Sequence, residues 1–554
     1  MAQQGSNAPE GAADDQFDFI IVGSGAASVG AALAAKSRGL KPLIIEKLDK
    51  FGGSTAFSGG VSWLPLNPYT KEKDTVEKAL AYFEATTGDV GPASSLERRL
   101  AFINNAPEWV DLFRAQGVEF VCPNWPDYYN ERPGGLREGR SLIVPPFDLR
   151  ELGDWQDKVG FSPNLPQIPL ATTEYLELTN IKTSFKAKML GLRIGWRMLT
   201  AKLLGRKLRA SGVAFQGRLL KVALRENIPI WLSSPVRHLV VEDGRVVGVE
   251  IEQNGVRRTI RASRGVLLNT GGFSHNKEMR DKYQPFGLDP RWAWSNPGDT
   301  GDMLPELEAL GAYTEMMEES WWVPGSMLPS GKPVFNVPGQ SGKPHHIVVS
   351  SKGERIGNET GAYMEFGQRM IKDGGPIWAI IDSQGRSKYG WAECPPGITP
   401  KSLIEQGYFL KDDSIEGLAA KCGIDPAGLR STIERFNGYA RTGVDPEFGR
   451  GDSANNGYIG DITHKPNPAL GTLEKAPYYA VRLVLTDVGT SGGVMTDEYA
   501  RVVRRDGTAI PGIYATGNLT ASVLGRCYLG AGASIGASSV FGYIAAKHAA
   551  GAND

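Results

Sequence analysis

The chain has 554 residues, more than one ordinary hydrophobic core accommodates, so two or more domains are expected. Lys plus Arg and Asp plus Glu are equal at 61 each, a balance that gives no support to nucleic acid as a partner. Hydrophobic residues make up 41% of the chain and charged residues 22%, which is typical of a globular protein with an ordinary surface and not of a disordered chain.

Residues 1–16 are polar and acidic, and they lack the basic start and apolar stretch of a secretory signal. We expect them to be a disordered lead-in. The four cysteines, Cys122, Cys394, Cys422 and Cys527, lie far apart and form no CxxC pair. A disulfide framework, a zinc site and an attached haem are therefore not expected, and no metal is predicted. This use of cysteine fits a reducing compartment, so we expect a cytoplasmic protein. No apolar run approaches the ~18 residues of a membrane span.

The first predicted elements form a βαβ unit. A β-rich run at 17–22 ends in the turn Gly23-Ser-Gly-Ala-Ala-Ser28, and a helix is predicted at 29–37. A second strand at 42–45 ends in Glu46. This order is that of a nucleotide-binding unit, with a tight glycine turn, a helix N-terminus that faces the pyrophosphate, and an acidic residue that binds a ribose hydroxyl. The third glycine of the motif is replaced by a serine that is small enough for close packing of helix on strand.

NAD and FAD both use such a unit, and later glycine loops decide between them. A second glycine loop at 51–60 follows Glu46 directly. Near the other end of the chain, glycine-rich segments at 512–518 and 530–536 precede an apolar helix that ends near Ala549. A cofactor held by both ends of the chain is long, and FAD is the longer of the two.

This pattern resembles the flavoprotein family that contains fumarate reductases, succinate dehydrogenases and 3-ketosteroid dehydrogenases, from Phe17 to Ala549. Segments 264–272 and 298–302 are also similar. The resemblance implies an α/β fold in which a Rossmann-like FAD-binding domain is discontinuous and an α+β catalytic domain is inserted into it. The implied boundaries are 17–290 and 482–554 for the FAD-binding domain, with a basic insert at about 165–210, and 291–481 for the catalytic domain.

The resemblance also implies which residues contact the cofactor. Some relatives attach the flavin through a histidine in the loop after the acidic residue, but this loop contains glycines and no histidine, so FAD is expected to bind non-covalently. The implied contacts come from the two ends of the chain and from three segments between them. They are Gly23, Gly25, Ala26, Ala27, Ser28, Glu46, Lys47, Gly52, Gly53, Ser54, Thr55, Ser58, Gly59, Gly60, Val236, Thr270, Gly271, Gly272, Asp302, Gly517, Asn518, Ala533, Ser534 and Ile535.

Two segments argue against the dicarboxylate reductases of the family. In those enzymes an Asn-Glu pair is followed four residues later by a proton-donating arginine, whereas here Asn358-Glu359 is followed by Tyr363. Their substrate-binding histidine is also absent before the turn at 489–493. Because a dicarboxylate requires cationic partners, fumarate reduction is not expected.

The residues found in place of that arginine and histidine are similar to those of 3-ketosteroid Δ1-dehydrogenases. The run Tyr528-Leu-Gly-Ala-Gly532 resembles the motif in which a tyrosine hydroxyl and a glycine N–H bind the C3 carbonyl. The position of Tyr363 resembles that of the proton-abstracting tyrosine. Residues 125–129 resemble the segment that supplies a supporting tyrosine, and Tyr128 is preferred to Tyr129 for that role.

The expected reaction converts a 4-ene-3-ketone to a 1,4-diene-3-ketone. Donors on the C3 oxygen, Tyr528 and Gly532, stabilise the developing enolate. Tyr363 takes the C2 proton as a tyrosinate, and the C1 hydride passes to flavin N5. Since a phenol has an ordinary pKa near 10, we expect Tyr128 to lower the pKa of Tyr363 by donating a hydrogen bond to it.

Two alternatives stay open. One is a related dehydrogenase that introduces the double bond at C4–C5 of a 5α-3-ketone and that binds the C3 carbonyl with the same two donors. A flavin-bearing electron-transfer module without an organic substrate is the alternative of a different class. The sequence does not identify the steroid side chain, the oligomeric state or the physiological electron acceptor, for which a quinone is one candidate.

The segment 182–209 is unusually basic, since no acidic residue occurs between Leu178 and Arg225. Its apolar residues have a helical spacing of four, three, four, three and four, and cations flank this stripe. Such a helix is suited to the inner face of a membrane, and the alternative is a helix packed on its own protein with a solvated basic face. The stripe is Phe185, Met189, Leu192, Trp196, Leu199 and Leu203, and the cations are Lys182, Lys186, Arg193, Arg197, Lys202, Arg206 and Lys207.

Overall fold

A computed structural model of the chain describes residues 16–551, so nearly all of the predicted lead-in lies outside the described residues. The first strand, β1, begins at Gln16 and not at residue 17 as predicted. The strand starts earlier because Gln16 pairs with Arg261, a residue of a strand that comes about 245 positions later in the chain. The predicted strand at 42–45 is confirmed as β2 (Pro42–Ile45), and the predicted helix at 29–37 is α1 (Ser28–Lys36).

The larger sheet contains the nucleotide-binding unit. In residues 16–551 it has eight strands, and its central order is β19-β20-β10-β1-β2-β7. The strands from β20 to β7 are parallel, whereas β8, β9 and β19 join antiparallel. This arrangement confirms the predicted Rossmann-like α/β layer. The strands not yet given are β7 (Ile230–Trp231), β8 (Val236–Glu242), β9 (Arg245–Gln253), β10 (Val256–Leu268), β19 (Arg501–Val503) and β20 (Ala509–Ala515).

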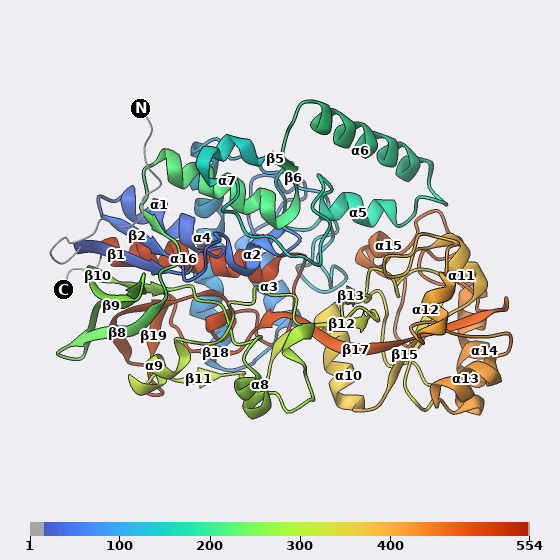
Figure 1. Cartoon of the computed structure of the whole chain (residues 1–554). Helices are drawn as coiled ribbons and strands as arrows, with labels where there is room; N and C mark the ends of the chain where they lie inside the picture. Colours follow the sequence, from blue (N-terminus) through green and yellow to red (C-terminus); the bar gives the residue numbers. More distant parts are fainter. Residues whose placement is uncertain (1–15, 552–554) are drawn as a thin grey trace.

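Helices from both ends of the chain pack beside this sheet (Figure 1). The predicted C-terminal helix is α16 (Ala533–Gly551), which is apolar around most of its circumference and largely buried. It contacts α1 so closely that a Cβ at Gly542 would lie 2.5 Å from that of Ala27. The remaining helices of this part are α2 (Gly53–Ala56), α3 (Val76–Thr86), α4 (Leu96–Ala115), α7 (Ser211–Arg225), α8 (Lys277–Tyr283) and α9 (Leu304–Ala309).

A second sheet forms the other half of the molecule, at the right of Figure 1. In the described chain it has six strands, with the order β13-β12-β17-β15-β14 and with β16 paired to β17. Its strands are β12 (Ser320–Met327), β13 (Pro333–Phe335), β14 (His346–Val349), β15 (Ile377–Ile381), β16 (Leu410–Asp412) and β17 (Tyr478–Thr490). Its helices are α10 (Tyr363–Asp373), α11 (Ser383–Lys388), α12 (Lys401–Glu405), α13 (Ile415–Cys422), α14 (Pro426–Thr442) and α15 (Ala454–Ile459).

The predicted boundary at 481 falls inside β17, which runs on to Thr490. Three short strand pairs connect further segments, namely β3 (Ser62–Trp63) with β4 (Ser141–Leu142), β5 (Phe147–Asp148) with β6 (Leu208–Arg209), and β11 (Thr314–Glu315) with β18 (Gly493–Val494). The pairing of β11 with β18 joins the start of the predicted catalytic domain to the segment after β17. The domain boundaries therefore remain predictions.

The basic insert forms two helices at the periphery. Helix α5 (Thr172–Leu178) leads into α6 (Phe185–Leu203), which lies apart from both sheets at the top of Figure 1. The predicted helical stretch 182–209 thus contains α6 but extends past both of its ends. Across residues 16–551, no helix combines the length and apolar character that crossing a bilayer requires.

Candidate active site

The first glycine turn brings the end of β1 close to the end of β10. The backbone of Gly23 has φ +98°, and a Cβ there would lie 2.1 Å from the carbonyl oxygen of Asn269. Only glycine fits such a position, because side chains are disfavoured in this conformation and the space is filled. Helix α1 follows with no side-chain cap at its N-terminus and no acidic residue in its first turn. Such a helix end is suited to an anion such as pyrophosphate.

The predicted acidic residue lies beside this turn. Glu46 is buried at the end of β2, and its carboxylate accepts hydrogen bonds from the backbone N–H and hydroxyl of Ser24, at 3.0 and 2.6 Å, and from Leu48 N–H at 2.9 Å. Burial raises the pKa of Glu46, and these donors offset part of that effect. The carboxylate thus stabilises the glycine turn, and it also lines the cavity in which a ribose hydroxyl is expected.

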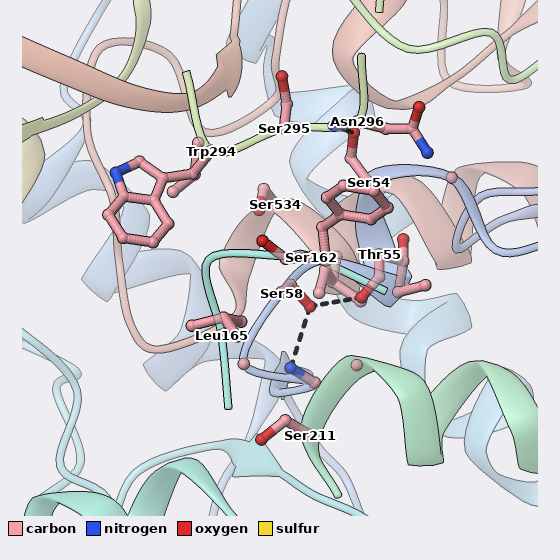
Figure 2. A pocket seen from close by; sticks show the side chains of 18 of the residues that line it. Ser54, Thr55, Ser58, Ser162, Leu165, Ser211, Trp294, Ser295, Asn296 and Ser534 are labelled. Atoms are coloured by element: carbon pink, nitrogen blue, oxygen red, sulfur yellow. Dashed lines mark hydrogen bonds between the residues drawn. The ribbon is translucent and has the colours of Figure 1, made fainter. Parts of the chain in front are cut away.

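The second glycine loop faces the first one. Figure 2 shows Ser54, Thr55 and Ser58 at the cavity, with dashed lines for the bonds from Ser58 to Thr55 and from the Gly60 N–H to Ser58. Ser54 donates a 2.7 Å hydrogen bond to Asp299. Burial raises the pKa of Asp299 to about 7, against the lowering effect of Ser54.

These segments enclose a cavity of about 920 Å³, near the upper end of the usual range for ligand sites. Most of the predicted cofactor residues line it, from both ends of the chain and from the segments around Val236, Thr270 and Asp302. The lining residues among those predicted are Gly23, Gly25, Ala26, Glu46, Lys47, Gly53, Ser54, Thr55, Ser58, Gly59, Gly60, Val236, Thr270, Gly271, Asp302, Gly517, Asn518, Ser534 and Ile535.

Five predicted contacts lie behind the cavity wall instead: Ala27, Ser28, Gly52, Gly272 and Ala533. Each is used for packing or for backbone bonds. Ser28 is fully buried and donates to the carbonyl of Gly25 at 2.9 Å, and Gly52 N–H donates to Ser24 at 2.8 Å. A Cβ at Gly272 would lie 1.8 Å from the Thr490 hydroxyl. Ala27 and Ala533 are both fully buried. Ala533 belongs to the hydrophobic core, and Ala27 lies against Gly542 of α16.

Sequence reasoning missed several polar residues at the cavity. Asn269 follows β10 directly and lines the cavity, yet its side-chain nitrogen is buried without a hydrogen-bond partner within residues 16–551. Ser295 and Trp294 also line the cavity and carry unpartnered buried donors, and both are labelled in Figure 2. The position of Asn269 at the carboxyl end of a parallel strand is the signal that identifies it, because ligands of such sheets bind there. Trp294 and Ser295 carry no comparable signal.

Three tyrosines from distant parts of the chain meet at one end of this cavity. Tyr128 lies in a loop, Tyr363 is the first residue of α10, and Tyr528 lies just before α16. The ring centroids of Tyr363 and Tyr528 are 4.9 Å apart, and Tyr128 is 5.8 Å from the first and 6.0 Å from the second. All three rings are buried and line the cavity.

The structure separates Tyr128 from its neighbour. Tyr129 does not line the cavity, and its hydroxyl donates to Glu365 at 3.3 Å. The geometry therefore favours Tyr128 as the supporting residue. Cys527 is buried near Tyr129, and burial raises the pKa of its thiol to about 11, which agrees with a packing role.

Tyr528 and Gly532 both face the cavity from the loop that leads into α16. The Tyr528 hydroxyl lies 3.0 Å from that of Ser534. Gly532 has φ +85°, and a Cβ there would lie 2.0 Å from the carbonyl oxygen of Val61, so no other residue fits. Its N–H has no hydrogen-bond partner within residues 16–551. A hydroxyl and a free N–H on one short loop can bind one carbonyl oxygen together.

Burial governs the protonation of the tyrosines. It raises the pKa of Tyr363 well above the ordinary value, and the neighbouring Tyr528 and Tyr128 raise it further. Burial likewise raises the pKa of Tyr128, and the hydrogen bond with Tyr363 lowers it only in part. The expectation that Tyr128 lowers the pKa of Tyr363 is therefore wrong for this arrangement, because Tyr128 adds to the effect of burial instead of offsetting it.

The segment that corresponds to the Asn-Glu pair has a structural role. Glu359 is fully buried in ion pairs with Arg355 at 2.8 Å and Arg450 at 3.0 Å. The Asn358 side chain donates to Asn456 at 3.0 Å and accepts from Thr360 N–H at 2.9 Å. Neither residue lines the cavity. They fix the loop from which α10, and with it Tyr363, begins.

The sequence matches the FAD binding domain family over residues 18–535. It is 38% identical to a 3-oxosteroid 1-dehydrogenase of Mycolicibacterium smegmatis, with 96% of each chain covered, and 37% identical to one of Mycobacterium tuberculosis, with 97% of this chain and 98% of the other covered. Among solved structures, a 3-ketosteroid Δ1-dehydrogenase from Sterolibacterium denitrificans, in complex with 1,4-androstadiene-3,17-dione, is similar with a TM-score of 0.89 and 34% identity. That match covers 97% of this chain and 99% of the other.

Proposed function

This chain belongs to the FAD binding domain family, and we propose that it is an FAD-dependent 3-ketosteroid Δ1-dehydrogenase. The observation that carries the proposal is the convergence of Tyr128, Tyr363 and Tyr528 on one cavity beside a nucleotide-binding turn. It occurs in a chain that is 38% identical over nearly its whole length to a 3-oxosteroid 1-dehydrogenase. The predicted fold class and the predicted FAD cofactor are both confirmed by the family match.

The cavity fits FAD on its own chemistry. The uncapped N-terminus of α1 suits the pyrophosphate, Glu46 suits a ribose, and the unpartnered donors of Asn269 and Ser295 suit polar atoms of a buried ligand. None of the residues that line the cavity is a histidine, which supports non-covalent binding. When bound, FAD accepts the hydride that leaves C1 of the steroid, a chemistry that side chains cannot supply.

The C3 carbonyl of the substrate is held by Tyr528 and Gly532. The hydroxyl and the N–H each donate a hydrogen bond to its oxygen, and these bonds strengthen as negative charge develops there. Both donors belong to one short loop, and the φ of Gly532 makes the backbone approach possible. Polarisation of the carbonyl acidifies the neighbouring C2–H bond.

Tyr363 is the proposed base. As a tyrosinate it takes the C2 proton onto its phenolic oxygen, and the electrons of the broken C–H bond move into the C2–C3 bond as the enolate forms. Because burial raises the pKa of Tyr363, the tyrosinate is a minor species at neutral pH. One feature of the fold stabilises it for the time of the reaction, namely the positive end of α10, of which Tyr363 is the first residue.

The proposal is tested by titrating the purified holoprotein anaerobically with a 4-ene-3-ketosteroid. The flavin absorbance should bleach while a 1,4-diene-3-ketone appears. The flavin of Tyr363→Phe should bleach far more slowly. The flavin of the control Tyr129→Phe should bleach as in the unchanged protein, because the Tyr129 hydroxyl contacts Glu365 and does not line the cavity.

Other outcomes identify the alternatives. Refusal of the 4-ene-3-ketone and bleaching by a 5α-3-ketone would identify the Δ4-dehydrogenase. Flavin that stays oxidised with every ketosteroid would favour the electron-transfer module and would refute the proposal.

We further propose that α6 docks on an anionic lipid surface. Its predicted stripe is exposed, with Phe185 at 77%, Leu192 at 68% and Leu203 at 75% of full accessibility. The residues that α6 buries, Ala187, Ile194 and Ala201, lie on the opposite face of the helix. Solvent-exposed apolar side chains in one row, flanked by cations, match an interfacial helix.

The cations of α6 differ in whether they bind within the protein or remain exposed at the surface. Arg197 points inward, where it forms two hydrogen bonds with Glu174 of α5, at 2.8 and 2.7 Å, and one with the Pro169 carbonyl at 2.7 Å. It fastens α6 to the segment that walls the cavity, and its prediction as a lipid-facing cation is wrong. Lys186 and Arg193 pair with Glu177 at 2.9 Å and Glu174 at 3.9 Å, but their side chains remain 81% and 71% exposed, so both can also contact anionic headgroups. A steroid and a quinone both dissolve in lipid, so a quinone is the acceptor that we propose.

The docking proposal is tested by sedimentation with vesicles of phosphatidylglycerol and phosphatidylcholine. Leu192→Glu with Leu203→Glu removes two contacts that are each worth ~1–2 kcal/mol, so vesicle affinity should fall at least about tenfold while flavin stays bound. Ile462→Glu, at a 75% exposed site outside the insert, is the matched control and should bind normally. Deletion of 182–209 should release the protein from the membrane fraction. Unchanged partitioning of these variants would mean that α6 is a solvated helix.

A further inference from the structure

The two loops that carry Tyr128 and Tyr528 contain no helix or strand, so another feature must fix their separation. The carbonyl oxygen of Leu529 lies between them. It accepts one hydrogen bond from the Tyr128 N–H at 3.0 Å and another from the hydroxyl of Tyr82 at 2.7 Å. The same Tyr82 hydroxyl accepts a bond from the Tyr129 N–H at 3.1 Å. One phenol oxygen therefore bridges the backbones of both loops.

Tyr82 is well suited to hold a fixed position. It lies in α3, is fully buried, and its ring packs against Trp63 with centroids 6.2 Å apart. The guanidinium of Arg140 lies over the same ring, 5.4 Å from its centroid. The side chain is thus confined by a helix on one side and by packed groups on the others, so its hydroxyl has little freedom to move.

The same surroundings anchor each loop separately. Asp127, next to Tyr128, forms a fully buried ion pair with Arg140 and accepts a 2.7 Å hydrogen bond from the Trp63 indole. On the other loop, a Cβ at Gly530 would lie 2.4 Å from Trp63, so this loop rests directly on the indole. Trp63 thus contacts both loops, and the Tyr82 hydroxyl is hydrogen-bonded to the backbone of both.

We propose that Tyr82 is a positioning residue, which sets the distance between the supporting Tyr128 and the carbonyl-binding loop of Tyr528 and Gly532. This inference rests on the proposed function. Tyr82 does not line the cavity, so it acts through the backbone of the two loops and does not touch the substrate. Loss of its hydroxyl leaves the Tyr129 N–H without its acceptor and allows the loops to shift against each other. A displacement of ~1 Å between reacting groups can slow a reaction about 10²-fold.

The test compares Tyr82→Phe with Tyr389→Phe in the flavin-loaded protein. Tyr389 is an equally buried tyrosine whose hydroxyl donates to Asp461 at 2.9 Å, in the half of the molecule built on the second sheet. Tyr82→Phe should lower the rate constant for flavin reduction at least about tenfold, with the apparent Kd for a 4-ene-3-ketosteroid changed by less than about threefold. Its pH profile for that rate constant should be displaced, because the spacing of Tyr128 and Tyr363 affects the protonation of the base. Tyr389→Phe should leave the rate constant and the profile unchanged.

Equal rates and equal pH profiles for both variants would overturn the proposal and leave Tyr82 a packing residue. If Tyr82→Phe does not retain flavin, Trp63→Phe takes its place, since it keeps a ring beneath Gly530 but removes the indole donor to Asp127. The same fall in rate is then expected, and an unchanged rate overturns the proposal. An unchanged protein that no ketosteroid reduces would refute the proposed function itself, and the positioning role with it.

Discussion

Replacement of Glu359 by glutamine tests how firmly the loop before Tyr363 is held. The carboxylate is fully buried and meets the guanidinium groups of Arg355 and Arg450 at 2.8 and 3.0 Å, and it also accepts the Val348 N–H at 3.0 Å. Burial opposes the charge on Glu359, but the two arginines outweigh it and lower its pKa to about 2 from an ordinary 4.5.

The lowered pKa of Glu359 gives the size of the expected loss in unfolding free energy. A depression of roughly 2.5 pKa units corresponds to about 3 kcal/mol of stability. Since the pKa is lower in the folded chain than in the unfolded chain, this stability is fully present above pH ~4.5 and is lost as the pH falls towards about 2. Glu359→Gln should therefore lower the free energy of unfolding by about 3 kcal/mol at pH 7, and the loss should shrink by roughly 0.8 kcal/mol at pH 4.

Urea unfolding followed by tryptophan fluorescence at the two pH values measures the difference. Glu354→Gln is the control, because Glu354 is exposed on the same loop and its replacement should change the free energy of unfolding by less than about 0.5 kcal/mol. A loss at Glu359 below about 1 kcal/mol, or one that grows as the pH falls, would refute the reasoning. Flavin reduction by the folded variant should also be slower, because Tyr363 begins the helix that this loop leads into.

Three further predictions concern the tyrosine site. Tyr528→Phe removes one proposed donor to the C3 oxygen, so steady-state kcat/KM should fall ~10²–10³-fold with flavin retained, and a fall of less than about tenfold would argue against the clamp. Because burial raises the pKa of Tyr363, the rate constant for flavin reduction should rise by about tenfold per pH unit between pH ~6 and ~9 in stopped-flow measurements, and a flat profile would exclude this base. Gly532→Ala places a Cβ 2.0 Å from Val61 O at φ +85°, so steroid binding measured by equilibrium titration should be lost, and normal affinity would contradict the structure of this loop.

The nucleotide-binding half was predictable because its signals are local. The glycine turn, the strand at 42–45 and its terminal Glu46 all follow from residues that are neighbours in the sequence. The pairing of β1 with β10, and the run of β17 across the predicted boundary, depend on contacts between residues more than about 100 positions apart. No periodicity or spacing encodes those contacts, and for this reason the sequence alone places Gln16 in the lead-in.

The candidate site was predictable only in part, for the same reason. Residues 128, 363 and 528 share no local pattern, and their grouping came from resemblance to a family. Periodicity predicted an apolar stripe on α6, but it could not reveal that the stripe is exposed or that Arg197 turns towards Glu174. Tyr82 carries no signal in the sequence, because its role depends on the backbone of two loops far from it.

The raised pKa of Tyr363 links the choice of substrate to the choice of base. In the described part of the chain three cations line the cavity: Lys47 pairs with Asp302 at 2.7 Å, Lys332 pairs with Glu393, and Arg209 donates to the Leu208 carbonyl at 3.0 Å. None of them is among the main causes of the pKa shift of Tyr363. A free cation beside Tyr363 would lower its pKa, but it would also attract carboxylates. A wall that penalises charge excludes such ligands and admits a neutral ketone. The same apolar surroundings keep Tyr363 protonated before the reaction. Tyr528 and Gly532 must therefore acidify the C2–H bond strongly enough for a small population of tyrosinate to remove the proton.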